Sequence, residues 1–210
     1  MEELRKFHNE CKFNLIERCV SKGQSVLDCG CGRGGDWSKW KRIGVSLTAV
    51  DPDEASIQEA IKRANTHRLR NVCIHRGDVR NVQGVFDAIC YNFSIHYIRD
   101  TFKESIEAIA RKTRRGGLLF GIVPDFDSVC SFVSPDPLGN TVDIVDQYHI
   151  AVKLVDGPFY NGIVRTEPTM NRRILEEGLA HWFELVEWSP MCETSGFISD
   201  IYSQFIFRRK

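Results

Sequence analysis

The chain has 210 residues and no linker rich in proline, glycine or serine, so its length and composition predict one domain with one substantial core. It carries 28 basic and 28 acidic residues, and this balance excludes binding to nucleic acid through overall charge, which leaves a local basic patch as the means. Its apolar runs are too short to span a bilayer, and residues 1–6 lack the apolar stretch of a signal peptide. We therefore expect a soluble, intracellular protein.

The chain begins with a predicted helix over residues 3–20, where apolar positions recur at helical spacing. Strand-like apolar runs then alternate with helical stretches, which is typical of an α/β fold with a mostly parallel, doubly wound sheet. Strands are expected at 25–29, 46–50, 71–76, 86–93 and 117–123, with helices at 36–42, 53–66 and 100–113.

The pattern changes after Pro124-Asp125. Residues 141–145 and 149–155 alternate like a hairpin, and residues 169–181 predict a helix after Pro168. The closing segments 183–188 and 204–208 predict an antiparallel terminal strand pair, which is the methyltransferase variation on the Rossmann fold.

The cysteines indicate a reducing compartment, because they mostly fall within apolar runs where buried free thiols are typical. No CxxC pair is present, and Cys29 and Cys31 lie in a glycine-rich turn, so no metal site is expected. The eight cysteines are Cys11, Cys19, Cys29, Cys31, Cys73, Cys90, Cys130 and Cys192.

The most informative segment is the glycine-rich turn 28–36, which follows an apolar run and precedes a helical stretch. Glycines bring backbone amides close to a ligand, but the carboxylate of Asp28 within the turn would repel a pyrophosphate, which disfavours NAD, FAD and nucleoside triphosphates. The lysine and hydroxyl residue of a P-loop are absent. Asp51 ends the next apolar run, where a carboxylate can accept from both ribose hydroxyls. We therefore expect S-adenosylmethionine as the cofactor.

Several separated motifs then resemble one family, the mRNA cap guanine-N7 methyltransferases of eukaryotes and large DNA viruses. The motifs are residues 5–12 (RKFHNECK), the glycine-rich turn followed by Lys39-Trp40-Lys41, and residues 92–97 (NFSIHY). The compact stretch between Pro124 and Glu167 resembles viral members, of the kind found in multifunctional capping enzymes such as that of African swine fever virus. Asn92 stands where many relatives have glutamine, and Cys29 where many have leucine.

The resemblance implies a set of cofactor residues. Lys12 would reach the methionine carboxylate, Asp51 the ribose hydroxyls and Asp78 the adenine amino group. Asp28 and Asp36 would orient the turn or bind the methionine ammonium, although Asp36 can equally cap the following helix, Asp78 can be an ordinary turn residue and Lys12 a solvated charge. The expected cofactor-binding residues are Lys12, Asp28, Gly30, Asp36, Asp51, Asp78, Asn92, Phe93, Ser94 and Tyr97.

The resemblance also implies a guanine site of aromatic and apolar groups, with His96 and Glu167 on the edge of the base. A carboxylate that accepts from N1 and the exocyclic amine favours guanine over adenine, and base stacking supplies about 1 to 3 kcal/mol. Singly, Phe93 and His96 could be structural, and Tyr91, Tyr148 and Tyr160 compete with Tyr202. The expected cap-binding residues are His8, Asn9, Arg33, Arg63, Phe93, His96, Pro124, Glu167 and Tyr202, of which Arg33, Arg63, His8 and Asn9 would face the triphosphate.

The implied activity is transfer of a methyl group to N7 of the GpppN cap guanine, with His96, Tyr97 and Glu167 as positioning residues and no general base. The basic run 111–115 is interpreted as the end of a helix, where cations meet the helix dipole, and not as an RNA site. The alternatives are a small-molecule methyltransferase and a non-catalytic cap-binding subunit.

The resemblance also sets the expected organisation and setting. A single domain over residues 1–210 would comprise the N-terminal helix 3–20, a cofactor half 24–123 and cap-binding additions 124–210. The partners would be capped RNA and the triphosphatase and guanylyltransferase domains of a capping enzyme. The location would be the nucleus for a cellular protein, and the host cytoplasm or the virion for a viral one.

Overall fold

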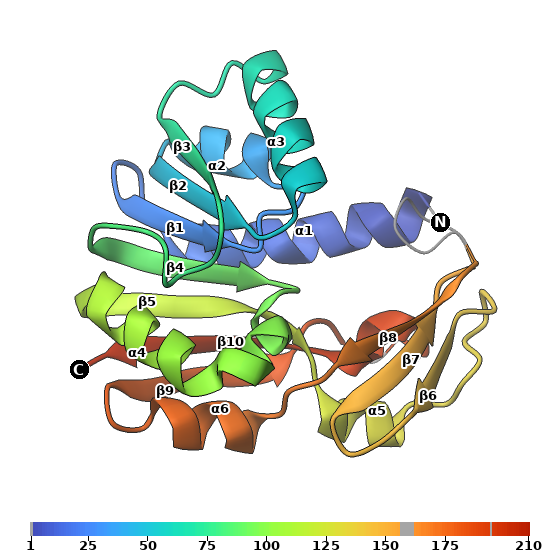
Figure 1. Ribbon diagram of the computed structural model, residues 1–210. Helices are drawn as coiled ribbons and strands as arrows, with labels where there is room; N and C mark the ends of the chain where they lie inside the picture. Colours follow the sequence, from blue (N-terminus) through green and yellow to red (C-terminus); the bar gives the residue numbers. More distant parts are fainter. Residues whose placement is uncertain (1, 156–161, 194) are drawn as a thin grey trace.

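A computed structural model describes residues 2–155, 162–193 and 195–210 of the chain, and its framework is one seven-stranded sheet (Figure 1). Successive side chains of the strands point to opposite faces of the sheet, and side chains on both faces are buried, as expected for a sheet covered on both sides. These strands are β1 (Ser25–Cys29), β2 (Ser46–Asp51), β3 (Val72–Arg76), β4 (Phe86–Asn92), β5 (Thr113–Pro124), β9 (Phe183–Pro190) and β10 (Tyr202–Arg209).

The order of the strands in this sheet is β3-β2-β1-β4-β5-β10-β9. β1 to β5 pair in parallel, whereas β10 runs antiparallel to both β5 and β9. The α/β fold with an antiparallel terminal pair, predicted from the sequence, is therefore confirmed. The order of the strands reverses between β1 and β4, and ligands of such sheets bind in the crevice at the carboxyl ends of the strands at this point.

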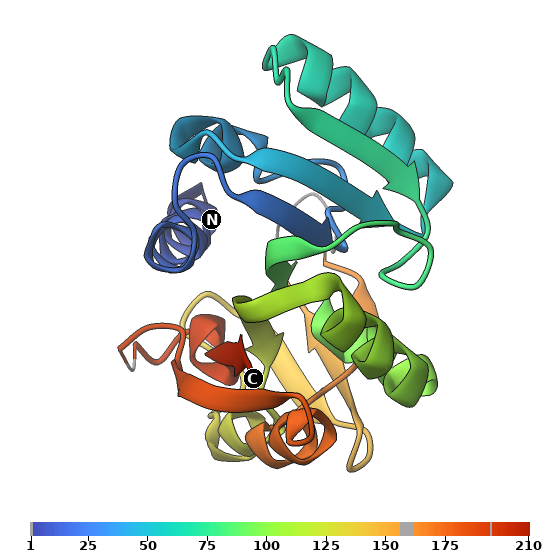
Figure 2. The same ribbon diagram turned by 90° about the vertical axis from the view of Figure 1, so that its left-hand side faces the viewer.

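Helices cover both faces of the sheet, as the two views in Figures 1 and 2 make plain. One buried cluster joins α1, α2 and α3 to the sheet, and a second joins α4, α6 and the 3-10 helix η1 to the opposite face. No helix in the described ranges is long and apolar enough to cross a membrane. The helices are α1 (Glu2–Cys19), α2 (Trp37–Ile43), α3 (Glu54–Thr66), η1 (Ile95–Thr101), α4 (Phe102–Lys112) and α6 (Arg172–Leu179).

A smaller antiparallel sheet of order β6-β7-β8 lies beside the carboxyl end of the main sheet (Figure 1). Its strands β6 (Thr141–Ile144) and β7 (His149–Lys153) form the predicted hairpin, and the third strand is β8 (Val164–Pro168). A short helix, α5 (Phe126–Ser131), joins the main sheet to this region along the chain, and a 3-10 helix, η2 (Ile198–Ile201), lies between β9 and β10 and contacts α5. The chain after residue 124 is therefore divided between the two sheets.

Three details differ from the expectations. The helix expected at 169–181 begins only at Arg172, because the backbone and hydroxyl of Thr169 both donate to the Tyr148 carbonyl and Asn171 caps the helix instead. β5 begins at Thr113, so Arg114 and Arg115 lie in a strand and not at a helix end. All eight cysteines are free, but Cys73 on the edge strand β3 and Cys130 on α5 are exposed.

Candidate active site

The turn between β1 and α2 lies at the carboxyl end of β1, where the order of the strands reverses. Its amides at Gly30 and Cys31 both donate to the Val50 carbonyl, at 2.8 and 3.0 Å. Gly30 has φ +74°, and a Cβ atom there would overlap the side chain of Ser94. The Ser94 hydroxyl in turn donates to the Cys29 carbonyl at 2.6 Å, so Ser94 fixes the turn from the end of β4.

Two aspartates follow the ends of neighbouring strands. The carboxylate of Asp51 accepts from the amides of Gly32 and Asp53, both at 2.9 Å, so it faces the glycine-rich turn. Asp78, after β3, forms an ion pair of 2.6 Å with Arg80, and its hydrogen bonds with Arg80 lower the pKa of the Asp78 carboxyl. Asp51 is thus held at the expected cofactor turn, whereas Asp78 is engaged by a neighbouring arginine.

Asp36 is the centre of a buried network of charges between α1 and α2. Its carboxylate lies 2.7 Å from the ammonium groups of both Lys12 and Lys39, and Lys39 also donates to the amide oxygen of Asn9 at 2.9 Å. Burial alone would raise the pKa of Asp36, but the two ammonium groups outweigh it and hold the pKa at about 2. The helix-capping alternative for Asp36 is wrong, because its side chain makes no capping hydrogen bond.

Asp28 of β1 is buried near this network. Its carboxylate accepts from the Trp40 indole at 3.0 Å. Burial raises the pKa of Asp28 to about 7, and the nearby charge of Asp36 adds to the rise. A cationic ligand group at the turn would favour the ionised form of Asp28, which fits the expectation of a cofactor that carries an ammonium group.

Unpaired polar atoms lie at the end of β4. Among the described residues, both side-chain amide atoms of Asn92 and both ring nitrogens of His96 are shielded from solvent without a hydrogen-bond partner. Buried polar groups normally have partners, and a bound ligand can supply them. The carboxyl groups of Asp28 and Asp51 lie around the glycine-rich turn nearby. Taken together, these carboxyl groups and the unpartnered atoms of Asn92 and His96 fit an adenosine cofactor with a positive charge.

An aromatic cluster joins α1 to the ends of β4 and β10. The rings of Phe93 and Tyr202 meet edge to face at 4.9 Å, and the His8 ring stacks on Phe93 at 5.8 Å. Phe93 has φ +58°, a conformation that a bulky residue adopts only where its surroundings enforce it. Pro124 pairs with Tyr202 in the register of β5 and β10, so these four expected residues come together.

The structure also gives the charge state of His8 and the arrangement of the rings in this cluster. Burial and then the charge of Lys12 lower the pKa of His8 to about 4, so at the expected triphosphate position its ring would act as a neutral hydrogen-bonding group. Its Nε2 shares a 2.8 Å hydrogen bond with the Ser199 hydroxyl. The rings of Phe93 and Tyr202 contact each other, so there is no slot between these two rings in this conformation.

The edge-binding residues of the expected site also converge. The rings of His96 and Tyr97 lie 4.2 Å apart, and burial lowers the pKa of His96 to about 3. Burial raises the pKa of Tyr97, as do the charge of Glu167 and a hydrogen bond between them. The charge of Glu167 also contributes to the raised pKa of Tyr202, after burial. The Glu167 carboxylate on β8 is therefore a neighbour of both phenols.

The two expected arginines lie together, because Arg63 of α3 donates to the carbonyl of Arg33 in the glycine-rich turn at 3.0 Å.

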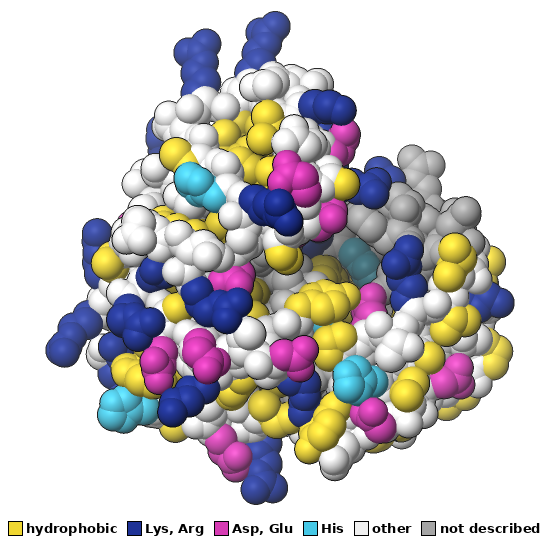
Figure 3. Space-filling model, viewed as in Figure 1, with side chains coloured by type: hydrophobic (Ala, Val, Ile, Leu, Met, Phe, Trp, Pro, Cys, Tyr) yellow, Lys and Arg dark blue, Asp and Glu magenta, His cyan; other side chains and the backbone are white. Residues whose placement is uncertain are grey.

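The structure also places two of the tyrosines that compete with Tyr202. Tyr148 lies under the Arg99 guanidinium, and Tyr91 is buried in the core cluster that includes α4, whereas Tyr160 lies outside the described residues. Figure 3 shows the expected site as a hollow between the upper part of the molecule and the small sheet. A histidine lies in its depth, and cationic side chains lie on both sides.

Sequence reasoning missed Lys39 and Ser199 as partners of site residues. The spacing of Lys39 from Asp36, three residues along a helix, is a signal that could have identified the ion pair. Ser199 carries no such signal, because its contact with His8 joins positions 191 residues apart.

Comparison with known sequences identifies the family. A sequence model described as the mRNA (guanine-N(7))-methyltransferase domain matches residues 1–149. An mRNA cap guanine-N(7) methyltransferase of Saccharomyces cerevisiae is 32% identical over 145 residues, covering 60% of this chain and 33% of that protein. The corresponding protein of Schizosaccharomyces pombe is 27% identical over 150 residues, covering 62% and 41%. The chain thus spans only about a third of the length of the first of these relatives.

Solved structures agree with this assignment at the level of the fold. An S-adenosylmethionine-dependent methyltransferase from Clostridium acetobutylicum has a TM-score of 0.65 at 18% identity, covering 97% of this chain and 91% of that one. The PH0226 protein of Pyrococcus horikoshii has a TM-score of 0.70 at 16% identity, covering 96% and 91%. With a family match over most of its length and a methyltransferase fold, the chain belongs to the mRNA (guanine-N(7))-methyltransferase domain family.

Proposed function

We propose that this chain methylates N7 of the guanine in a GpppN RNA cap, with S-adenosylmethionine as the methyl donor. The observation that carries the proposal is the convergence of His96, Tyr97 and Glu167 beside Ser94, the residue that fixes the glycine-rich turn. This convergence supports the assignment of Glu167 as the acceptor on the edge of the base, close to the turn proposed for the cofactor. A small-molecule methyltransferase would not call for this group of residues.

The chain's own residues would hold the cofactor at the carboxyl ends of β1, β2 and β4. Asp51 would accept from the ribose hydroxyls, and Asn92 would gain partners for its buried amide. Lys12, kept in place by Asp36, would reach the methionine carboxylate, and Asp28 would face the ammonium. When bound, S-adenosylmethionine supplies an electrophilic methyl group on a sulfonium centre.

The role of the protein in the reaction is to position the base. Glu167 accepts from N1 and the exocyclic amine of guanine, which adenine cannot match. His96 stays neutral at pH 7 because its pKa is about 3, so its ring acts as a hydrogen-bonding group and not as a cation. Guanine N7 carries no proton at neutral pH, so no side chain has to act as a general base, and orientation within the hollow accounts for catalysis.

The wider setting follows from the substrate. The chain would act after a triphosphatase and a guanylyltransferase have made the GpppN end, as the next domain of a capping enzyme or as a separate protein. It would work in the nucleus for a cellular source, and in the host cytoplasm or the virion for a viral one.

The test is transfer of radiolabelled methyl to GpppA-capped RNA, with ApppA-capped and uncapped RNA as controls and nuclease digestion to locate the label. We expect label in 7-methylguanosine from the GpppA substrate alone. Glu167→Ala should abolish the transfer, since the base loses its edge acceptor. Normal transfer by Glu167→Ala, or label on the ApppA substrate, would contradict the proposal.

A further inference from the structure

A groove of about 580 Å³ lies between α1 and α2, outside the residues assigned to the cofactor and the guanine. One wall is a single face of α1, where Arg5, Asn9 and Phe13 form one row at a spacing of four residues and Lys6 begins a second row. The other wall is α2, with Lys39 and Arg42. The groove is therefore a fixed surface between two packed helices.

The charge of this groove is strongly positive for a protein with no net charge. Arg5, Lys6, Lys39 and Arg42 line it, and Glu10 is its one acidic residue. Arg5, Lys6 and Arg42 are exposed, whereas Lys39 is buried on Asp36. This is the kind of local basic patch through which a neutral protein can bind the phosphates of a nucleic acid.

The groove shares residues with the charge network beside the proposed site. Asn9 and Lys39 line it and also belong to the network around Asp36, and Gly35 of the glycine-rich turn forms part of its floor. His8, the residue before Asn9, is in the aromatic cluster on the other side of α1. An RNA whose cap lies in the hollow continues from the cap, and the contacts from Asn9 and Lys39 through Asp36 to Lys12 link this groove to the proposed cofactor residues.

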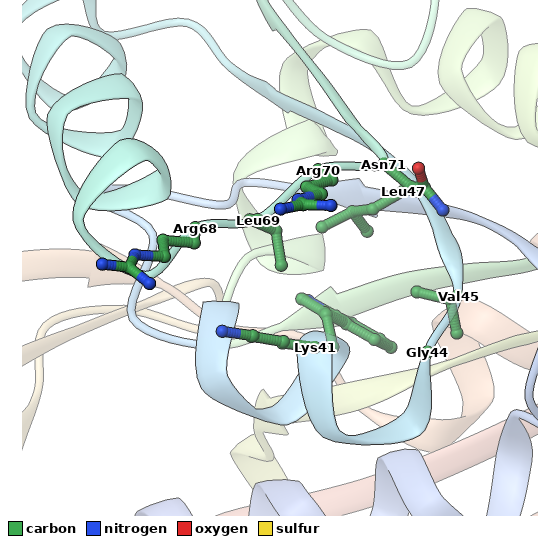
Figure 4. Close-up of a pocket in the computed structure, with 9 residues that line it drawn as sticks. Lys41, Gly44, Val45, Leu47, Arg68, Leu69, Arg70 and Asn71 are labelled. Carbon is green, nitrogen blue, oxygen red and sulfur yellow. The ribbon is translucent and has the colours of Figure 1, made fainter.

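A second basic cleft provides a comparison (Figure 4). It has a volume of about 370 Å³ and is lined by Lys41 of α2 and by Arg68 and Arg70 of the segment after α3. It also includes Leu47, near the amino end of β2, whereas Asp51 ends that strand at the proposed site. The cleft is therefore about 13 Å from the site along β2 alone, at 3.3 Å per residue, and shares no residue with it.

We propose that the groove between α1 and α2 binds the RNA chain that follows the cap, with Arg5, Lys6 and Arg42 contacting its phosphates. This inference rests on the proposed function and names the path of its substrate. Asn9 and the nearby Ser38 add the amide and hydroxyl groups that commonly contact phosphate and sugar. An acidic protein segment would match the charge but has no covalent link to the cap site.

The test measures binding and not activity. Fluorescence anisotropy would compare a labelled GpppA dinucleotide with a GpppA-capped RNA of about eight nucleotides at several salt concentrations. The wild-type protein should bind the capped RNA more tightly, with a steeper dependence on salt. The double variant Arg5→Ala/Lys6→Ala should lose about 1.4 from the slope of log K against log salt, at about 0.7 per single-strand phosphate contact, which is on the order of tenfold in affinity at 0.15 M salt.

The matched control is Arg68→Ala/Arg70→Ala, which removes the same charge from two exposed positions of the other cleft. It should bind both ligands as the wild-type protein does. Equal losses of RNA affinity in the two double variants would overturn the proposal. Equal affinity of the wild-type protein for the dinucleotide and the RNA would also overturn it, and would favour an acidic protein segment as the ligand of the groove.

A crosslink gives the location directly. With 4-thiouridine at the second to fourth nucleotides, the crosslinked peptides should come from α1 and α2, and crosslinks to the segment after α3 would contradict the groove. Failure of the wild-type protein to bind the dinucleotide would count against the proposed function itself, whereas intact dinucleotide binding without the gain from RNA counts only against the groove.

Discussion

The proposed function gives the carboxylates of Asp51 and Glu167 separate tasks, and their surroundings support this division. Asp51 accepts two backbone amides and so faces the glycine-rich turn. Glu167 lies on β8 of the small sheet and hydrogen-bonds to the Tyr97 phenol. Removal of each carboxylate should therefore affect a different ligand.

We expect Asp51→Ala to weaken binding of S-adenosylhomocysteine about 10- to 100-fold, because hydrogen bonds to a charged group contribute about 1.5 to 3 kcal/mol. Glu167→Ala should bind S-adenosylhomocysteine normally and lose affinity for GpppA. Isothermal titration of both variants with both ligands checks this division. A loss of both affinities in either variant would show that the two ligand sites are not separable at these residues.

Single residues also mark the limit of sequence reasoning. Asp51 was predictable from its place at the end of an apolar run, and Glu167 only from family resemblance, because a glutamate in a polar segment carries no local signal. The lowered pKa of His8 was not predictable, since its larger cause is burial among residues far away in sequence, such as Phe93 and Tyr202, and only the smaller cause is the nearby charge of Lys12.

At the level of elements, the turn from β1 to α2 depends on one close contact. Gly30 adopts a positive φ and leaves room for Ser94, while the nearby Gly35 has no atom within 4 Å of its missing Cβ position. The two glycines of one turn thus differ in what a methyl group would meet.

Gly30→Ala should weaken binding of S-adenosylhomocysteine and lower the free energy of unfolding by more than about 2 kcal/mol, because the positive φ and the overlap with Ser94 both add to the cost. Gly35→Ala should change the stability by less than about 0.5 kcal/mol. Urea denaturation of the two variants measures the difference. Similar stability of the two proteins would contradict the tight packing of Gly30.

The elements of the main sheet were predictable because their apolar runs are long and clearly spaced by helical stretches. β8 was missed because its sequence, Val164-Arg165-Thr166-Glu167-Pro168, is polar and ends in proline, as an edge strand tolerates. α5 was missed because it is short, and it depends on Asp125 as its N-cap. Tertiary pairing with β7 and β10, and not local preference, defines this part of the chain.

At the scale of the whole molecule, the dependence of stability on pH combines opposing groups. The pKa of Asp28 is raised to about 7, whereas an aspartate in the unfolded chain has a pKa near 4. Between about pH 4 and pH 7, Asp28 is therefore protonated in the folded protein and ionised in the unfolded chain. Stability from this group therefore falls as the pH rises through that window. The lowered pKa values of His8 and His96 act in the opposite direction, since the unfolded chain binds protons that the folded protein excludes.

Asp28→Asn should isolate the first contribution, because an amide cannot ionise while its oxygen still accepts from Trp40. The free energy of unfolding of the variant minus that of the wild-type protein should rise from pH 4 to pH 7, by at most about 1.4 kcal/mol per pH unit. The histidine contributions cancel in this difference. Urea denaturation at each pH provides the values, and a constant difference across the window would contradict an uncharged Asp28.

The hydrogen bond between His8 and Ser199 also has a consequence for synthesis of the protein. A ribosome adds about 5 to 20 residues per second, so about 10 to 40 s separate the appearance of these two residues. Phe93 and Tyr202 are 109 residues apart, so the aromatic cluster can assemble only after Tyr202 has been synthesised. A nascent chain that already contains the complete glycine-rich turn therefore passes through a period in which the cluster of His8, Phe93 and Tyr202 has not yet formed.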